Sequence, residues 1–467
     1  MRFNLFCTFA AMSVTKPSLP KGTRDFSPLE MVKRNYIYDT IKTVFKKYGY
    51  AEIQTPSMEN LQTLTGKYGD EGDKLIFKIL NSGDYLSKVD EALLASKNSN
   101  ATISKISEKA LRYDLTVPFA RYVVMHQSEI AFPFKRFQVQ PVWRADRPQK
   151  GRYREFYQCD ADVVGSPSLL NEAEFVLIYH EALTNLGLKD FDIKINNRKI
   201  LSGIAEIIGK PELIVDMTVA IDKLDKIGLD GVSKELLERG FTEADIEKLK
   251  PVILLEGSNV EKLESLKNVL ATSEIGLKGI EEIEKVFSYV SNLKSNISNL
   301  KLDITLARGL NYYTGCIFEV KTNEVAMGSI GGGGRYDDLT GMFGLKDLTG
   351  VGISFGADRI YDVLEELNLF PTSAQQGTKV LISNFDEAAE LYALPLLQQL
   401  RAANIASELY PASAKLKKQM SYADAKNIPF VVLIGEEEMQ SGQLTLKDMA
   451  NGEQQKLTAA EIVDKLK

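Results

Sequence analysis

The chain has 467 residues, a length that corresponds to about three domains at roughly 150 residues each. Its 57 basic and 63 acidic side chains give a net charge of −6, so a nucleic acid would have to be bound by a local basic patch and not by overall charge. The composition, with 44% hydrophobic and 26% charged residues, excludes disordered, collagen-like and coiled-coil classes, and the scarce, scattered His126, His180, Cys7, Cys159 and Cys316 exclude a zinc finger, a His-rich metal centre and a disulfide framework.

Residues 1–18 are expected to form an N-terminal extension. The start, MRFNLFCTFAAM, has one arginine and a short apolar run, and so faintly resembles a secretion signal. Asn4 and Thr8 interrupt that run, and we favour the alternative of a plain extension before a second possible start at Met12. No stretch reaches the roughly 18 to 20 uninterrupted apolar residues of a membrane helix, and we expect a cytoplasmic protein in a reducing compartment.

The next segments alternate between helix and strand signals. Apolar residues at helical spacing predict an amphipathic helix over Leu29–Tyr48, ended by Gly49, followed by a strand closed by Pro56. From Asp73 to Lys109 the pattern indicates a strand, a turn and a mobile polar connection. Two runs rich in aromatic and β-branched residues between Phe134 and Val164 predict an antiparallel hairpin with a long charged tip, RPQKGRY.

The second half of the chain changes texture twice. Residues 196–300 are rich in Lys, Glu, Leu and Ile at helical spacing and predict a helical insertion. Strand signals return in KLDITLARGLNYYTGCIFEV, and VGISFGADRIYDVLEEL indicates a strand that leads into a helix. After a polar linker at 369–376, the order β, α, β, α, β, β predicts a small, mostly parallel α/β domain over residues 377–467.

Five cations lie within eleven positions of the hairpin tip: Arg144, Arg147, Lys150, Arg152 and Arg154. Such a run is usually a solvated face. Here aromatic residues alternate with the cations and strands flank them, and arginine forks suit phosphate while an aromatic ring suits an adenine face. We therefore favour a nucleotide site over a solvated surface.

Two other segments have a role that the residues alone leave open. Gly331–Gly334 fit neither a P-loop nor a dinucleotide fingerprint, and could allow a ligand close to the backbone or form a tight turn. Asp114 and Thr116 lie two apart and could receive an ammonium group, or cap the following helix.

Arg308 is followed by a pair of tyrosines, Tyr312 and Tyr313. In an extended segment neighbouring side chains point to opposite faces, so we expect at most one of the two rings to face a given pocket. Arg308 lies among small and apolar residues, where an unpaired charge would be costly, and a ligand anion or a carboxylate is its expected partner.

Together these segments resemble the histidyl-tRNA synthetases, a branch of the class II aminoacyl-tRNA synthetases. KGTRDFSP at Lys21–Pro28, the arginine hairpin and GADR at Gly356–Arg359 are typical of the class, and LARGLNYYTG and GGGRYDDL of the histidyl branch. The likeness extends from about Leu19 to the C-terminus.

The resemblance implies an α/β fold, with an α+β catalytic core. The core would be the class II synthetase antiparallel sheet flanked by helices, over residues 19–195 and 301–368, interrupted by the helical insertion at 196–300. The C-terminal α/β domain at 377–467 would bind the anticodon.

The resemblance also implies a reaction and its partners. L-histidine and ATP would condense to histidyl-adenylate, and the histidyl group would pass to the 3′ end of tRNA(His). ATP is then a substrate accompanied by Mg²⁺, no protein cluster binds a metal, and a homodimer with no membrane or DNA partner is expected.

Two rival interpretations remain beside this one. The first is a non-catalytic histidine-sensing relative that regulates an ATP phosphoribosyltransferase, and the second is a synthetase for another amino acid. The retained Arg144, Arg152, Arg308 and Arg359 and the domain after Gly377 argue against the first, and YYTG and GGGRYD against the second.

Roles for individual residues follow only from the resemblance. The residues implied for histidine are Asp114, Thr116 and Gln158 at the α-ammonium, Asp162 and Tyr312 at the imidazole with Tyr313 close by, and Gly331, Gly332 and Gly333 as a wall. Arg144 would hold the α-phosphate and the carboxylate side, and Arg308 would stabilise the α-phosphate as charge develops there. Phe156 would stack on adenine, and Arg152 and Arg359 would bind the outer phosphates.

The tRNA contacts implied are Arg147 and Gln149 at the acceptor end, and Lys415, Lys417 and Lys418 at the anticodon. One position departs from the family: Asn311 stands where many members have Asp. Arg308 would then have one carboxylate partner fewer.

Overall fold

This computed structural model describes residues 16–293, 297–307, 312–375 and 377–467. The chain forms two compact units. The first comprises the residues up to Asp25 and Thr40–Leu367, and the second comprises Phe26–Asp39 and Asn368–Lys467. Helix α1, Pro28–Lys47, belongs to both.

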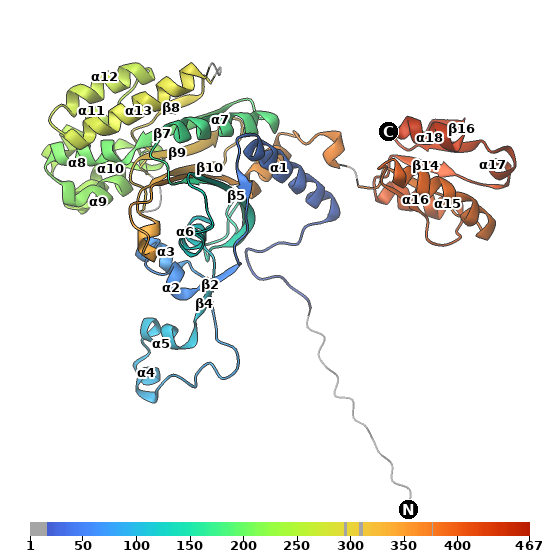
Figure 1. Ribbon diagram of the computed structural model, residues 1–467, viewed down its shortest axis with the longest axis horizontal. Coiled ribbons are helices and arrows are strands. Elements are labelled where there is room, and N and C mark those ends of the chain that lie inside the picture. Colours follow the sequence, from blue (N-terminus) through green and yellow to red (C-terminus); the bar gives the residue numbers. More distant parts are fainter. Residues whose placement is uncertain (1–15, 294–296, 308–311, 376) are drawn as a thin grey trace, which may run out of the picture. The chain divides into compact units, whose positions relative to one another are not determined.

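A sheet of eight strands is the centre of the first unit, in the order β1-β5-β6-β11-β10-β9-β7-β8 (Figure 1). The strands are β1 Ala51–Glu52, β5 Phe134–Trp143, β6 Glu155–Val164, β7 Phe191–Asn197, β8 Leu300–Leu302, β9 Cys316–Thr322, β10 Gly331–Tyr336 and β11 Gly350–Gly356. The two outermost pairs, β1 with β5 and β7 with β8, are parallel, and every pair between them is antiparallel. The predicted antiparallel sheet and the hairpin β5–β6 are confirmed.

The four consecutive glycines lie inside this sheet. Gly331–Gly334 form most of β10, which pairs with β11 on one side and β9 on the other. The alternative of a tight turn is therefore wrong. Because glycines have no side chains, a ligand can approach the backbone of this strand closely.

Helices cover one face of the sheet and fill the segment between β7 and β8. Helix α7, Leu170–Asn185, packs against β7, β11 and α13, and Figure 1 shows the neighbouring helical layer. The helices after β7 are α8 Arg198–Ile208, α9 Ile214–Ile221, α10 Leu224–Glu238, α11 Glu243–Ile253, α12 Asn259–Val269 and α13 Glu274–Asn292. Capping boxes start two of them, Thr242 with Asp245 and Ser258 with Glu261. The predicted helical character of this segment is confirmed.

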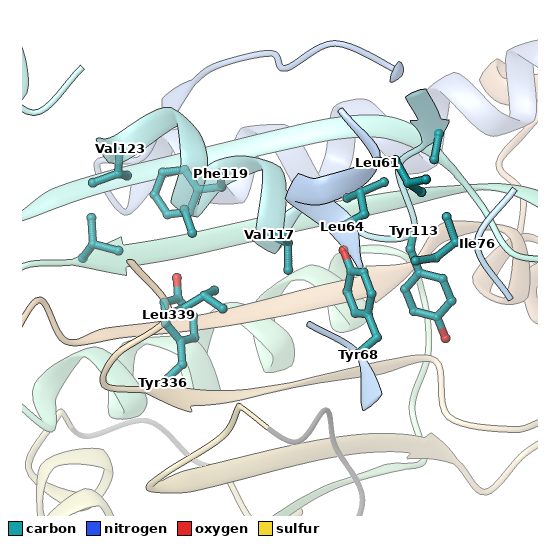
Figure 2. Packing of buried hydrophobic residues seen from close by; sticks show 13 residues of the cluster. Leu61, Leu64, Tyr68, Ile76, Tyr113, Val117, Phe119, Val123, Tyr336 and Leu339 are labelled. Carbon is teal, nitrogen blue, oxygen red and sulfur yellow. The ribbon is translucent and has the colours of Figure 1, made fainter. Parts of the chain in front are cut away.

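The opposite face is covered by α6, Thr116–Met125, by the short helices α2, Leu61–Leu64, and α3, Gly69–Lys74, and by a second small sheet. That sheet has the order β2-β4-β3, with β2 Met58–Asn60, β3 Lys78–Ile79 and β4 Lys109–Leu111. Figure 2 shows the apolar cluster beneath it, where Leu64, Val117 and Phe119 are completely buried. This cluster fixes the position of the segment that carries Asp114.

The polar segment between β3 and β4 contains two short helices. They are α4, Glu91–Ser96, and α5, Ser99–Ile106. The side chains of Asp90 and Asn98 accept hydrogen bonds from Leu93 N and Ala101 N and begin them. The prediction for this part was a strand, a turn and a mobile polar connection, and it did not include these two helices because their caps were not recognised.

The second unit contains a sheet of five strands in the order β13-β12-β14-β15-β16. Its elements are β12 Val380–Ile382, α15 Glu387–Ala402, β13 Ser407–Leu409, α16 Leu416–Ala425, β14 Phe430–Leu433, α17 Glu436–Ser441, β15 Leu444–Asp448, β16 Gln454–Leu457 and α18 Ala459–Leu466. Strand β12 is parallel to β13 and β14, whereas β14, β15 and β16 are antiparallel. The sheet is therefore mixed, and the expectation of a mostly parallel sheet was wrong. Across the described residues, no helix is long and apolar enough to cross a membrane.

Candidate active site

Two adjoining cavities lie on the surface of the large sheet. The larger cavity has a volume of about 360 Å³, within the range of small-molecule sites, and the smaller one about 60 Å³. Six residues line both: Arg144, Gln158, Tyr313, Gly332, Gly333 and Ser354. They are two parts of one pocket.

The floor of this pocket is built from rows of residues on adjacent strands. Since alternate residues of a strand share a face, positions 136, 138 and 140 of β5 lie beside positions 162, 160 and 158 of β6, and these beside 352, 354 and 356 of β11. The three rows are Arg136–Asp162–Gly352, Gln138–Asp160–Ser354 and Gln140–Gln158–Gly356. A strongly polar stripe thus crosses the middle of the sheet.

Arg144 follows β5 and lies where the two cavities meet. Its Nε donates to Tyr113 O at 3.1 Å. Its guanidinium carbon lies 4.2 Å from the ring centroid of Tyr113 and 5.2 Å from that of Phe156. Held between two rings, this cation can contact groups in both cavities at once.

Asp114 is buried in the wall of the smaller cavity. It accepts hydrogen bonds from Tyr68 OH at 2.9 Å and Val117 N at 3.1 Å, and Tyr312 OH lies 3.4 Å from its second oxygen. Burial raises its pKa, although these bonds oppose the shift. Leu115 is the N-cap residue of α6, but Asp114 accepts from Val117 N in the first turn and also lines the cavity, where it could receive an ammonium group. Thr116 lines the cavity as the first residue of α6.

Asp162 is the second buried carboxylate of the smaller cavity. It accepts from Tyr336 OH at 2.7 Å, and its other oxygen lies 2.6 Å from Arg136 Nη2. A Cβ at Gly352 would lie 2.0 Å from the Asp162 carboxylate, so only glycine leaves room for this side chain. Burial raises the pKa of Asp162, and Arg136 opposes the shift.

Tyr312 and Tyr313 both line the smaller cavity. Their ring centroids are 5.0 Å apart and the rings meet edge to face. The expectation that at most one could face the pocket was wrong, because β9 begins only at Cys316 and the tyrosines lie outside any strand. Burial raises the pKa of both phenols, which therefore remain neutral donors.

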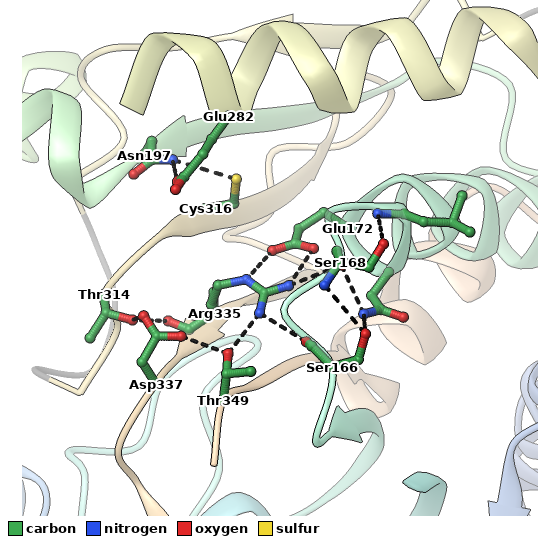
Figure 3. A network of polar contacts seen from close by, with 12 residues as sticks. Ser166, Ser168, Glu172, Asn197, Glu282, Thr314, Cys316, Arg335, Asp337 and Thr349 are labelled. Atoms are coloured by element: carbon green, nitrogen blue, oxygen red, sulfur yellow. Dashed lines mark hydrogen bonds and ion pairs between the residues drawn. The ribbon is translucent and has the colours of Figure 1, made fainter. Parts of the chain in front are cut away.

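A polar network secures the segment that follows these tyrosines (Figure 3). Arg335 is buried and paired with Glu172, with Nη2 2.7 Å from Oε2, and its Nη1 donates to Thr349 Oγ1 at 2.8 Å. Asp337 accepts from Thr349 and from Thr314, each at 2.6 Å. Arg335 and Asp337 belong to the motif GGGRYDDL, but no role for them followed from the sequence. Their part in holding this segment depends on contacts with Glu172, Thr349 and Thr314, which the motif does not contain.

The larger cavity is lined by arginines. Arg359 Nε donates to Gly151 O at 2.7 Å and Nη1 to Ser329 O at 2.6 Å, whereas Arg152 is 48% exposed and lies 3.8 Å from Asp146. Phe156 also lines this cavity, and Gly331, Gly332 and Gly333 form part of its wall. Arg24 of KGTRDFSP is ion-paired with Asp358 of GADR, which joins two motifs far apart in the sequence.

The remaining expected residues lie elsewhere. Arg308 and Asn311 fall outside the described residues. Arg147 and Gln149 are exposed at the hairpin tip, where Gln149 and Arg152 exchange backbone hydrogen bonds. Lys415, Lys417 and Lys418 are exposed at the start of α16 in the second unit. Within the described part of the chain, no group of three or more His, Cys, Asp and Glu side chains could hold a metal ion.

Comparisons with known proteins give the family of the chain. The family model described as histidyl-tRNA synthetase matches residues 104–360, and that of an anticodon binding domain matches residues 379–467. Histidine–tRNA ligases of Phocaeicola vulgatus and Christiangramia forsetii are each 62% identical, over 96% and 95% of this chain and 98% and 97% of theirs. The crystal structure of histidyl-tRNA synthetase from Nostoc sp. PCC 7120 has a TM-score of 0.82 at 32% identity, covering 97% of this chain and 99% of that one.

These likenesses extend over nearly the whole chain and include both of its units. They favour the ligase and not the regulatory relative. The chain belongs to the histidyl-tRNA synthetase family.

Proposed function

We propose that this chain carries out the histidine–tRNA ligase reaction in the pocket described above. L-histidine and ATP condense there to histidyl-adenylate and pyrophosphate, and the histidyl group then passes to the 3′ end of tRNA(His). The observation that carries the proposal is the single pocket in which a small cavity rich in buried carboxylates and phenols adjoins a larger one lined by arginines. Arg144 contacts both parts.

The smaller cavity suits the amino acid. Asp114, Thr116 and Gln158 would bind the α-ammonium, and Asp162 and Tyr312 the imidazole, with Tyr313 beside it and Gly331, Gly332 and Gly333 as the wall. An imidazole offers one donor and one acceptor, which match a carboxylate and a neutral phenol. An apolar side chain of similar size would leave these buried groups unpaired, and such sites reject analogues by about 10⁴ or more.

The larger cavity suits the nucleotide. Phe156 would stack on adenine, Arg152 and Arg359 would bind the outer phosphates, and Arg144 would hold the α-phosphate beside the histidine carboxylate. Arg308 is proposed at the same phosphorus, where negative charge develops. The attacking group is the substrate's own carboxylate, so catalysis needs no protein nucleophile and depends on positioning and electrostatic stabilisation.

The family implies a divalent metal with the nucleotide, and we propose that it is Mg²⁺. Mg²⁺ usually keeps several waters and takes one or two carboxylates besides phosphate oxygens. Glu319 and Asp146 line the larger cavity and fit that requirement as its protein ligands. The ion would neutralise charge on the outer phosphates.

Binding of tRNA is assigned to two exposed basic groups. Arg147 and Gln149 on the hairpin tip would meet the acceptor end, and Lys415, Lys417 and Lys418 the anticodon. We further propose a cytoplasmic homodimer, a catalytic core at 19–195 and 301–368 with the insertion at 196–300, and anticodon binding by residues 377–467. The match of residues 379–467 to an anticodon binding domain supports the last assignment.

The test is amino-acid-dependent exchange of pyrophosphate into ATP. We expect L-histidine to stimulate exchange and each of the other standard amino acids to leave it at background. Binding of histidine by folded protein without exchange would contradict catalysis and favour the regulatory relative. Stimulation by a different amino acid would contradict the assignment of the smaller cavity.

The tRNA assignment is tested with the same protein. Replacing Lys415, Lys417 and Lys418 together by alanine should raise the KM for tRNA several-fold and lower the salt dependence of charging, because each phosphate contact contributes to that slope. Pyrophosphate exchange should not change, since these residues lie far along the chain in the second unit. Equal losses in both assays would remove the lysines from the proposed role.

A further inference from the structure

One buried carboxylate of the smaller cavity has no role in the reaction as proposed. Asp160 lies on β6 between Gln158 and Asp162, is 2% exposed, and lines the smaller cavity. Its Oδ1 atom is buried and has no hydrogen-bond partner among the residues that the structure describes. Buried polar atoms are rarely left unpaired, so this oxygen calls for an explanation.

The residue directly opposite Asp160 on β5 has the same property. Gln138 pairs with Asp160 in the strand register, and its Oε1 is also buried without a hydrogen-bond partner in the described part of the chain. The amide nitrogen of Gln138 donates to Thr55 Oγ1 at 3.1 Å and to Gln140 Oε1 at 2.7 Å, which fixes Oε1 as the remaining group. Directly opposed residues have Cβ atoms about 4.5 to 5.5 Å apart, so two buried acceptors without a donor among the described residues belong to neighbouring side chains on one face of the sheet.

A proton on Asp160 would satisfy both oxygens. A carboxyl group has one O–H donor, and Gln138 Oε1 is the acceptor that lacks one. The pKa of Asp160 agrees with this, since burial, opposed by Arg136, raises it to about 7.

The charged and titratable groups around Asp160 come from several elements. They are Arg136 on β5, Asp162 on β6, Asp114 before α6, Arg112 after β4, Tyr313 before β9 and Tyr179 on α7. Asp114 and Asp162 disfavour a third negative charge. Arg136 favours it, but Arg136 already lies 2.6 Å from Asp162.

The second connection of Asp160 leads to the ligand side. Asp160 shares a hydrogen bond with the hydroxyl of Ser354, its neighbour on β11. Ser354 Oγ in turn accepts from Gln158 Nε2 at 2.8 Å. With its nitrogen held in this way, Gln158 presents a buried Oε1 that has no partner among the described residues and lines both cavities.

We propose that protonated Asp160 is a positioning residue for histidine recognition. Its O–H donates to Gln138 Oε1, its other oxygen accepts from Ser354, and Ser354 thereby holds Gln158 with Oε1 ready to accept from the α-ammonium of the substrate. The inference rests on the proposed function, because it assumes that histidine occupies the smaller cavity. It adds Asp160 and Ser354 to the groups that determine recognition of the amino acid.

The test compares three variants in histidine-dependent pyrophosphate exchange. Asp160→Ala and Ser354→Ala should each raise the KM for histidine about tenfold with a smaller change in kcat, because one hydrogen bond to a charged group is lost. Asp160→Asn should restore most of that loss, since its amide nitrogen can donate to Gln138 and its oxygen can accept from Ser354. If Asp160→Asn raises the KM for histidine as much as Asp160→Ala does, the proposal of a protonated Asp160 is wrong.

The pH profile provides a second readout. The ratio of the KM of the unaltered protein to that of Asp160→Asn cancels the titration of histidine itself. Because Asp160 is protonated below about pH 7 and ionised above it, the ratio should stay constant to about pH 7 and rise several-fold by pH 8.5. A ratio that falls with pH would mean that ionised Asp160 is the working form, and a flat ratio that its protonation does not matter; both overturn the proposal.

Two histidine analogues separate positioning from a general structural effect. Histidinol keeps the ammonium group, and 3-(imidazol-4-yl)propionate lacks it. Ser354→Ala should weaken inhibition by histidinol about tenfold and leave inhibition by the propionate unchanged. Equal losses for both analogues would contradict a role through Gln158.

The two hypotheses fail separately in these assays. Histidine-dependent exchange by the unaltered protein tests the proposed function alone, whereas the variants test Asp160 and Ser354. Thermal unfolding of each variant shows whether it folds. If Asp160→Ala does not fold, Asp160→Asn and Ser354→Ala still decide the question.

Discussion

The smaller and the larger cavity of this pocket are built in different ways. In the smaller one the polar groups are buried and bonded to one another, as Asp114 is to Tyr68 at 2.9 Å and Asp162 to Tyr336 at 2.7 Å. In the larger one arginines line the wall: Arg152 is 48% exposed, and Arg359 donates hydrogen bonds to the backbone carbonyls of Gly151 and Ser329.

The difference matches what each part would have to recognise. An amino acid must be distinguished from others of similar size, which requires donors and acceptors fixed in advance in a site that excludes water. Phosphates carry much charge and little shape, and flexible cations suffice to bind them. Substitutions in the smaller cavity should therefore have large effects that depend on pH, and substitutions of exposed cations in the larger cavity should have smaller effects that depend on salt.

The largest effect is expected from removing the charge of Asp114. Asp114→Asn keeps the size of the side chain but leaves the substrate ammonium without its carboxylate, at a cost of about 3 kcal/mol, or roughly 100-fold in kcat/KM for histidine. Pyrophosphate exchange at varied histidine measures it. The matched control is Tyr68→Phe, which removes one hydrogen bond to Asp114 and should cost about 1 kcal/mol. Losses of equal size would show that the packing around Asp114, and not its charge, determines binding.

A second effect concerns how the stability of the fold depends on pH through Asp160 of the smaller cavity. The unfolded chain releases the Asp160 proton near pH 4, whereas the folded chain keeps it to about pH 7. Across that window the unfolded state binds fewer protons, so the free energy of unfolding falls as the pH rises, by about 1.4 kcal/mol per unit from this group. Below and above the window the group contributes no slope. Asp160→Asn should remove this slope, as measured by urea denaturation between pH 5 and pH 8.

Asp303 is the control for that measurement. Burial alone would raise its pKa, but hydrogen bonds from Lys194 and Thr305 outweigh burial and lower it. Its contribution to stability is therefore present above about pH 4 and lost only in stronger acid. Asp303→Asn should leave the slope between pH 5 and pH 7 unchanged. If Asp160→Asn and the unaltered protein give parallel curves, Asp160 is not protonated in this range.

Much of the fold followed from local patterns in the sequence. The hairpin β5–β6 was predicted because alternating aromatic and β-branched residues flank a tip rich in Pro, Gly and Arg, and the helices after β7 because their apolar residues recur at helical spacing. The second sheet was predicted less well. The spacing of strands and helices indicates alternation, but the direction of β15 and β16 depends on turns whose geometry the pattern does not determine.

The residues that line the pocket were predictable where a motif contains them, and the residues that support them were not, because only the fold brings those together. Asp114, Gln158, Asp162 and Tyr312 stand in segments that resemble the family, and they line one cavity. Gln138 and Ser354 lie in unremarkable strand sequences, and only the register of β5, β6 and β11 places them beside Asp160. The expectation that at most one of Tyr312 and Tyr313 faces a given pocket was wrong, because the period of a strand was assumed for a segment that lies outside any strand.

The smallest effect is expected in the larger cavity, at Arg152. Its side chain is 48% exposed and its nearest carboxylate, on Asp146, is 3.8 Å away. An exposed charge contributes at most about 1 kcal/mol, so Arg152→Ala should raise the KM for ATP about fivefold at low salt and leave the KM for histidine unchanged.

Raising the salt concentration to 0.5 M should reduce the effect of Arg152→Ala on the KM for ATP to less than about twofold, since salt screens exposed charges. Arg359→Ala is the matched comparison, because Arg359 is half-buried and its guanidinium is fixed by two carbonyls. Its effect on the KM for ATP should be larger and should persist at high salt, since a fixed and partly desolvated cation is screened less. If salt reduces the effects of both substitutions on the KM for ATP to the same extent, burial does not distinguish Arg359 from Arg152. The prediction that fixed cations in the larger cavity resist salt would then be wrong.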